Sequence, residues 1–147
     1  MKKFIAWLPA LAWMGVIFMM SAMPGDISGE QSGLVVEAVL FVVSALFGPE
    51  TAAAVSPDTI SLLVRKGAHM TEYAVLFLLY RHALSASGAK KPSLFAFVLS
   101  VCYAATDEWH QAFVDSRGPA LLDVGIDALG AGMAWMIFSF IKRKKER

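Results

Sequence analysis

The chain has 147 residues, a length typical of one domain, and 57% of them are hydrophobic while 17% are charged. This composition excludes a typical soluble domain and indicates an integral membrane protein. The net charge of +1 says little, because the charges are segregated along the chain. Cys102 is the only cysteine, which excludes an intramolecular disulfide. No nucleic-acid-binding motif is present, so we expect the bilayer, and no nucleic acid, as a partner.

The first predicted span covers residues 4–23, which carry no charge and follow the basic start Lys2-Lys3. Their length is close to the ~20 residues that a membrane-spanning helix needs. A signal peptide is the alternative, but its apolar core usually has only ~7–15 residues. We therefore expect a retained anchor, with Pro9 in its first turns, where a proline costs least.

Residues 24–63 form the predicted outer segment. Residues 24–30 are polar and rich in turn formers, so we expect a turn there. Residues 34–47 are apolar but include Glu37, and they are shorter than the ~18 residues expected of a span. This pattern predicts an interfacial or re-entrant helix that ends at Gly48-Pro49.

Three further spans are predicted at residues 64–84, 93–112 and 120–141. The helix that contains the second span is expected to begin at Pro57, with Ser56 as its N-cap. With four spans, most basic residues fall on the side of both termini, which the positive-inside rule assigns to the cytoplasm. These residues are Lys2, Lys3, Arg81, Lys90, Lys91, Lys142, Arg143, Lys144, Lys145 and Arg147.

Polar residues recur in the outer half of the three later spans. On the second span they follow spacings of three and four residues, which place Arg65, His69, Glu72 and Tyr73 on one helical face. Ionisable groups inside a membrane are costly, and they usually face a bundle interior or a wet cavity. We therefore predict one outward-opening pocket, formed by Arg65, Lys66, His69, Glu72, Tyr73, Asp107, Glu108, His110, Gln111, Arg117, Asp123 and Asp127.

The pocket admits several chemistries. As a ligand site it would bind an anion, because arginine holds a phosphate or a carboxylate through two hydrogen bonds. The ligand-binding residues would be Arg65, Lys66, Tyr73, Gln111, Arg117, Asp123 and Asp127. As an enzyme it would use acid and base groups, and the catalytic residues would be His69, Glu72, Asp107, Glu108 and His110. A divalent cation is the cofactor that carboxylates and imidazoles could bind, although no metal can be named from them. A polar clamp that only joins helices is the remaining interpretation.

These residues resemble the VanZ-like family of small bacterial membrane proteins. The matching pieces are Arg65-Lys66-x-x-His69-x-x-Glu72-Tyr73, then Asp107-Glu108-x-His110-Gln111, then Arg117 and Asp123-x-x-x-Asp127-x-x-Gly130, and they cover about residues 60–135. In the family, the position of Asp127 is often Asn. The resemblance implies a multi-pass protein of the bacterial inner membrane. It also implies a link with low-level resistance to the glycopeptide teicoplanin, with which the founding members are associated.

We therefore predict an all-α integral membrane four-helix bundle with an additional short interfacial or re-entrant helix, formed by residues 1–147 as a single VanZ-like domain. The favoured function is a cell-envelope protein whose outward-facing pocket binds an anionic lipid-linked or peptidoglycan-related ligand. A membrane-embedded hydrolase or transferase and a small proton-coupled transporter are the alternatives. A transporter with four spans and no inverted repeat would need to form a homo-oligomer.

Overall fold

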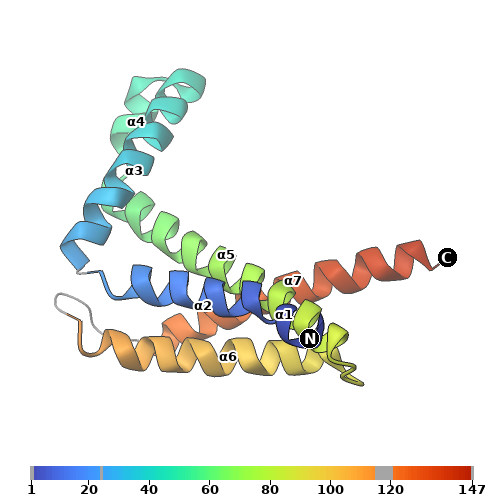
Figure 1. The fold of residues 1–147 in the computed structure, drawn as a ribbon. Coiled ribbons are helices and arrows are strands. Elements are labelled where there is room, and N and C mark those ends of the chain that lie inside the picture. The colour runs from blue at the N-terminus through green and yellow to red at the C-terminus, as the bar shows by residue number, and fades with distance from the viewer. Residues whose placement is uncertain (1, 24, 115–120, 147) are drawn as a thin grey trace.

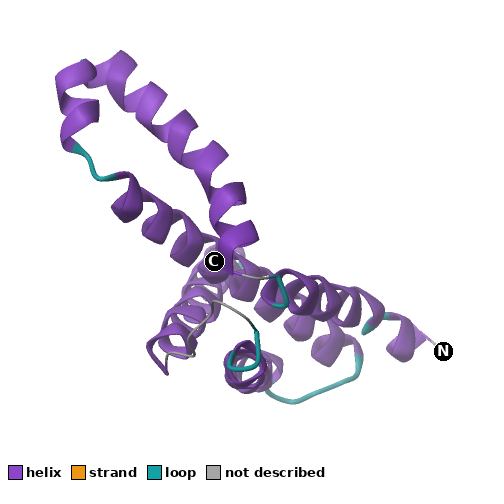
Figure 2. Cartoon of the chain, turned by 90° about the vertical axis from the view of Figure 1, so that its left-hand side faces the viewer, coloured by secondary structure: helices purple, strands orange, loops and turns teal. Residues whose placement is uncertain are grey.

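The computed structural model describes residues 2–23, 25–114 and 121–146 of the chain. Within these ranges the chain is all-helical and contains no strand, and short loops join the helices (Figure 2). The predicted all-α class is therefore confirmed. The helices are α1 Lys2–Ile5, α2 Leu8–Ser21, α3 Gly25–Phe47, α4 Pro49–Ala54, α5 Pro57–Ala86, α6 Pro92–Gln111 and α7 Leu121–Lys145.

The first predicted span is interrupted near its start. α1 ends at Ile5, and α2 begins at Leu8 with Pro9 in its first turn. Proline has no backbone N–H, and its ring clashes with the carbonyl of the residue four positions earlier, so it stops α1 before it. Taken together, Lys3–Ser21 is still long and apolar enough to cross a membrane.

The prediction of a turn in residues 24–30 is wrong from Gly25 onward, because α3 begins there and continues to Phe47. Helix growth is cooperative, so the apolar stretch extends a helix through neighbouring residues of weak propensity. The predicted end of this helix is confirmed. Gly48 has a φ of +93°, a backbone conformation that glycine adopts without steric cost.

α5 begins at Pro57 as predicted, and it is longer than the span expected within it. Its 30 residues extend about 45 Å at 1.5 Å per residue. Ser56 occupies the N-cap position, but the expected capping hydrogen bond from its side chain is not formed. The first turns of α5 lie beside α3. Together with α3 and α4 they form an arm that projects steeply from one end of the bundle (Figure 1).

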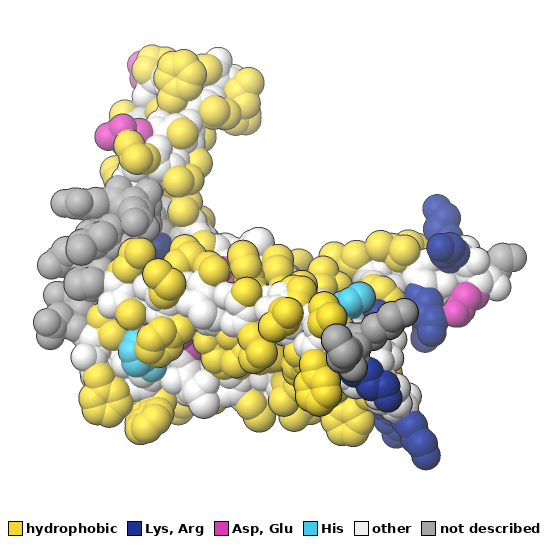
Figure 3. Space-filling view, in the orientation of Figure 1, with side chains coloured by type: hydrophobic (Ala, Val, Ile, Leu, Met, Phe, Trp, Pro, Cys, Tyr) yellow, Lys and Arg dark blue, Asp and Glu magenta, His cyan; other side chains and the backbone are white. Residues whose placement is uncertain are grey.

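The bundle itself consists of α2, α5, α6 and α7, with α5 in contact with each of the others. Its core contains Tyr73, Leu76 and Phe77 of α5, which are 0% exposed. Small residues from the neighbouring helices complete the core, including Ala10, Ala96, Ala104 and Ala131. Many large hydrophobic side chains of the bundle face outward (Figure 3).

In the described part of the chain, two helical segments are long and apolar enough to cross a membrane, Lys3–Ser21 and Leu121–Lys145. α5 and α6 are less apolar than these two segments, because polar and charged residues interrupt their apolar sequences. The two chain ends lie on the side of the bundle opposite the arm (Figure 1). Most Lys and Arg side chains visible in Figure 3 also lie on that side.

One glycine sets the distance between α5 and α7. A Cβ atom built on Gly130 would lie 2.1 Å from the backbone oxygen of Met70, so the two helix backbones touch there. The two neighbouring glycines of α7 make no such contact with the described residues. A Cβ on Gly125 would meet nothing within 4 Å, and one on Gly132 would meet only Phe97 at 3.7 Å.

Candidate functional site

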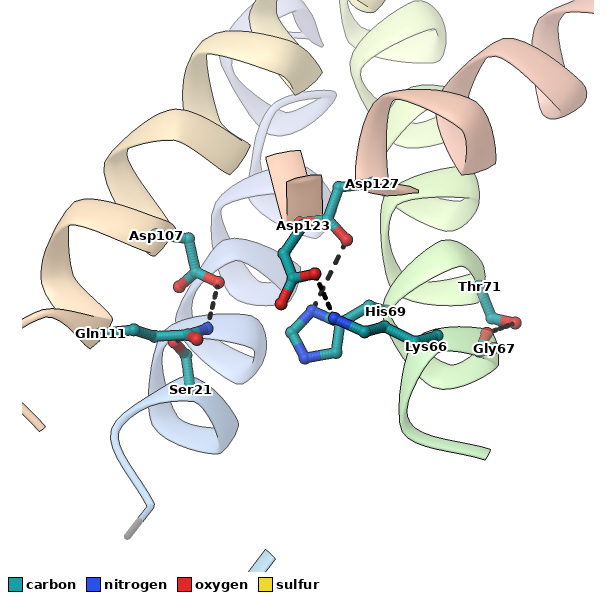
Figure 4. A network of polar contacts seen from close by, with 9 residues as sticks. All are labelled: Ser21, Lys66, Gly67, His69, Thr71, Asp107, Gln111, Asp123 and Asp127. Atoms are coloured by element: carbon teal, nitrogen blue, oxygen red, sulfur yellow. Dashed lines mark hydrogen bonds and ion pairs between the residues drawn. The ribbon is translucent and has the colours of Figure 1, made fainter. Parts of the chain in front are cut away.

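Four helices bring polar side chains together at the end of the bundle that carries the arm (Figures 1 and 4). The end of α2, the middle of α5, the end of α6 and the start of α7 meet there. On each of the last three helices the polar residues are three or four positions apart, so they share one face. We call this group the polar cluster, and it consists of Ser21, Lys66, His69, Tyr73, Asp107, Gln111, Asp123 and Asp127.

Two ionic contacts join α5 to α7 within the polar cluster. The Nζ atom of Lys66 pairs with Oδ1 of Asp123, and these side chains are 29% and 24% exposed. One turn deeper, Nδ1 of His69 lies 3.5 Å from Oδ1 of Asp127, whose side chain is only 1% exposed. The residues of each helix are three or four positions apart, so the two contacts lie one helical turn apart and join the same faces of α5 and α7 (Figure 4).

A second set of contacts joins α6 to α2. The side-chain amide of Gln111 donates to Oδ2 of Asp107 at 3.2 Å and to Oγ of Ser21 at 2.8 Å. All three side chains are buried. Ser21 was not among the predicted site residues, and a hydroxyl at the end of an apolar span was the only signal for it.

A hydrogen bond from Trp13 of α2 to α5 is another contact that was not predicted. The indole Nε1 donates to the backbone oxygen of Glu72 at 3.0 Å, next to Tyr73 of the polar cluster in the sequence of α5. A tryptophan inside an apolar segment needs a partner for this N–H group, which was the available signal. Together with Gln111 and Ser21, this hydrogen bond fixes α2 to the face of the bundle where the polar cluster lies.

Three side chains of the polar cluster bury oxygen atoms that have no hydrogen-bond partner among the described residues. These atoms are Oη of Tyr73, Oδ1 of Asp107 and Oδ2 of Asp127, while Oδ1 of Asp127 has only the 3.5 Å contact with His69. Leaving a buried polar group without a partner costs about 1–3 kcal/mol. Native proteins rarely leave such groups bare, and water, an ion or a ligand usually accounts for them. The interior of the cluster therefore has capacity to accept further hydrogen bonds.

Most predicted site residues lie in or beside the polar cluster. Glu108 is buried with 5% exposure, and Glu72 is partly buried on the same segment of α5. The side chain of Arg65 is exposed, so it lies outside the buried group although the helical spacing placed it on the same face. The ring of His110 packs against Phe18 of α2, with ring centroids 4.4 Å apart. Arg117 lies outside the described residues.

A divalent cation was one possibility that the carboxylates and imidazoles left open. Within the described part of the chain, no three His, Cys, Asp or Glu side chains lie in an arrangement that could hold a metal ion. The carboxylates are instead distributed over two separate sets of contacts, Asp123 and Asp127 toward α5 and Asp107 toward Gln111.

The fold and the cluster define an all-helical protein with segments apolar enough to enter a membrane and a buried polar group at one end of its bundle. The chain belongs to the VanZ/LLP1 family, whose family model matches residues 6–142. The resemblance seen in the motifs is thereby confirmed and extends over most of the chain. The family and the two apolar helices are consistent with a membrane protein of the cell envelope. No curated protein and no solved structure matches the chain.

Proposed function

We propose that α1–α2, α5, α6 and α7 all cross the bacterial inner membrane, with both termini in the cytoplasm. The charged residues that lower the hydropathy of α5 and α6 include Asp107 and Glu108, which are buried, so they do not oppose insertion as lipid-facing charges would. α6 has 20 residues, about 30 Å, which equals the thickness of the hydrocarbon core. The end that carries both termini is rich in Lys and Arg, in agreement with the positive-inside rule (Figure 3).

On this arrangement the polar cluster opens toward the outer side of the membrane and binds a cell-envelope ligand. The observation that carries this proposal is a set of buried oxygens without a hydrogen-bond partner among the described residues, namely Oη of Tyr73, Oδ1 of Asp107 and Oδ2 of Asp127. These oxygens favour a ligand that supplies O–H or N–H groups. A clamp that only joins helices would gain nothing from leaving them unpaired.

The rim of the site favours an additional negative charge on the ligand. Arg65 is exposed one turn before His69 on α5, where its guanidinium can bind a phosphate or a carboxylate. Lys66 adds a second positive charge beside it, although it is already paired with Asp123. A molecule that joins an anionic group to a hydroxyl-rich part, such as a lipid-linked saccharide or a peptidoglycan-related precursor, satisfies both requirements. The link with glycopeptide (teicoplanin) resistance enters this proposal from the family alone.

The experiment that tests the ligand site is native mass spectrometry of the protein purified in mild detergent. We expect the wild type to retain a phosphate-bearing lipid-linked saccharide or peptidoglycan precursor, and Asp127→Ala and Arg65→Gln to lose it. Glu37→Gln is the matched control, because it neutralises an exposed carboxylate far from the cluster. Circular dichroism checks that each variant keeps its helix content. Equal retention of this ligand by Asp127→Ala, Arg65→Gln and the control would contradict the proposal.

A second candidate function is a membrane-embedded hydrolase or transferase. The observation that favours it is the His69–Asp127 pair, because a carboxylate beside an imidazole orients it for acid or base chemistry. An enzyme predicts that His69→Gln still binds the lipid but accumulates it unreacted. A ligand site without chemistry predicts the same bound molecule in His69→Gln and in the wild type.

A further inference from the structure

A separate groove follows the length of α7. Its volume is about 780 Å³, and it shares no residue with the polar cluster. Its lining includes Gly125, Gly132 and Arg143 of α7, which are seven and eleven positions apart and therefore lie on one helical face. From Gly125 to Arg143 this face extends about 27 Å, close to the thickness of a hydrocarbon core.

Small residues create the hollow. Gly125, Ala128 and Gly132 line it, while Phe97 of α6 and Trp135 of α7 contribute large aromatic walls. The two glycines are not needed for contact between the described helices, because a Cβ on either would meet nothing of the described residues closer than 3.7 Å. They differ in this from Gly130, where the backbone of Met70 fills the space. The hollow beside Gly125 and Gly132 is therefore open to a molecule from outside the chain.

The charge distribution along the groove indicates which molecule fits. The lining is apolar over most of its length and ends at Arg143, within the basic run Lys142–Lys145. An apolar channel that ends in a guanidinium matches an acyl chain attached to a phosphate, because arginine binds phosphate oxygens through two hydrogen bonds. Met133 and Met136 line the same face, and their flexible side chains can follow the shape of a chain.

A second copy of the protein fits the same groove less well. Two α7 helices that pack in parallel through this face would bring two copies of Arg143, and the basic runs around them, close together. Like charges at that distance repel, and Glu146, the acid next to this basic run, is already paired with Lys142 at 3.6 Å. Charge complementarity therefore favours an anionic lipid over a homodimer.

We propose that this groove binds one anionic phospholipid, with an acyl chain along Gly125–Met136 and the headgroup phosphate on Arg143. This inference rests on the proposal that α7 crosses the membrane with its basic end in the cytoplasm. It concerns the cytoplasmic leaflet, whereas the polar cluster opens to the other side. Juxtamembrane basic residues at this leaflet attract anionic lipids in general, so the specific claim is the role of the groove and of Arg143.

The test is a titration of the purified full-length protein, followed by native mass spectrometry. The probes are dioleoyl phosphatidylglycerol and dioleoyl phosphatidylcholine, which carry the same chains and differ in net charge. We expect the wild type to prefer the anionic lipid and Arg143→Gln to lose about tenfold in affinity for it, equivalent to ~1.4 kcal/mol. Lys145→Gln is the matched control, because it removes the same charge from the same run without lining the groove. We expect it to bind like the wild type.

Filling the groove is the second arm. Gly132→Phe places a ring in the hollow, and we expect it to weaken both lipids by at least tenfold. Gly125→Leu repeats the test if Gly132→Phe loses helix content. Equal losses in Arg143→Gln and Lys145→Gln, or wild-type binding by the filled variants, would overturn the proposal. So would a wild-type dimer that Gly132→Phe dissociates, which would assign the groove to a second copy. Asp127→Ala, which removes a carboxylate of the polar cluster and does not line the groove, should leave phosphatidylglycerol binding unchanged, which separates this site from the polar cluster.

Discussion

Replacing Gly130 by alanine tests whether contact between the backbones of α5 and α7 holds the polar cluster together. The added Cβ would lie 2.1 Å from the backbone oxygen of Met70 and 2.7 Å from its Cα and carbonyl carbon. All three neighbours are backbone atoms, so no side chain can rotate away. The helices must move apart at a point one residue from His69 and three from Asp127, which form the deeper ionic contact.

The size of the effect follows from two opposing terms. Overpacking a well-packed contact costs ~1–3 kcal/mol in the free energy of unfolding. Because the neighbours of Gly130 are backbone atoms that cannot rotate away, we expect Gly130→Ala to cost about 3 kcal/mol. Alanine recovers about 1 kcal/mol of helix propensity relative to glycine. We therefore expect a net loss of about 2 kcal/mol in the free energy of unfolding. Gly132→Ala gains the same propensity without a clash, so the two variants should differ by about 3 kcal/mol.

The assay is unfolding by sodium dodecyl sulfate in mixed micelles, followed by tryptophan fluorescence. Gly132→Ala is the matched control, because it makes the same chemical change two positions away on the same helix. A difference of less than 1 kcal/mol between the two variants would refute the argument that the backbones touch at Gly130. It would also mean that the spacing of His69 and Asp127 does not depend on this glycine.

Three further substitutions test individual contacts of the site. Lys66→Met breaks the partly exposed pair with Asp123 and should lower the free energy of unfolding by about 1 kcal/mol in the same assay. This loss should become smaller as salt is added, because salt screens such pairs. Trp13→Phe removes the hydrogen bond to the Glu72 backbone oxygen and should cost about 1–2 kcal/mol, against no loss for the exposed control Trp109→Phe. Tyr73→Phe deletes a buried hydroxyl without a partner and should leave stability unchanged or raise it by about 1 kcal/mol, while lipid retention in native mass spectrometry falls.

The helices of the bundle were predictable because their signals are local. The hydrophobic runs, Pro57 at a helix start and Gly48 at a helix end gave boundaries that the structure reproduces within a few residues. The errors arose where a local signal competes with cooperativity. Residues 25–33 contain glycines and polar residues typical of turns, yet they continue into the helix formed by the apolar stretch after them.

The composition of the polar cluster was also largely predictable, because spacings of three and four residues determine which side chains share a face. What the sequence could not provide was the pairing between helices. The Lys66–Asp123 and His69–Asp127 contacts depend on how α5 and α7 approach each other, and hence on Gly130. The exposure of each side chain was the other property that the sequence could not provide. Arg65 shares the spacing of the buried residues, but its side chain is exposed.

Tyr73 distinguishes most sharply between a site that binds a molecule and a clamp that joins helices. In a clamp, the tyrosine hydroxyl is a cost without a function, so removing it can only be neutral or stabilising, and the bound lipid should not change. In a binding site, the same hydroxyl donates a hydrogen bond to the bound ligand or accepts one from it. Tyr73→Phe would then keep or gain stability and lose bound lipid. If Tyr73→Phe lowered both the stability and the lipid binding, neither interpretation would hold, because both treat the hydroxyl as unpaired. That result would mean that the hydroxyl has a hydrogen-bond partner within the chain.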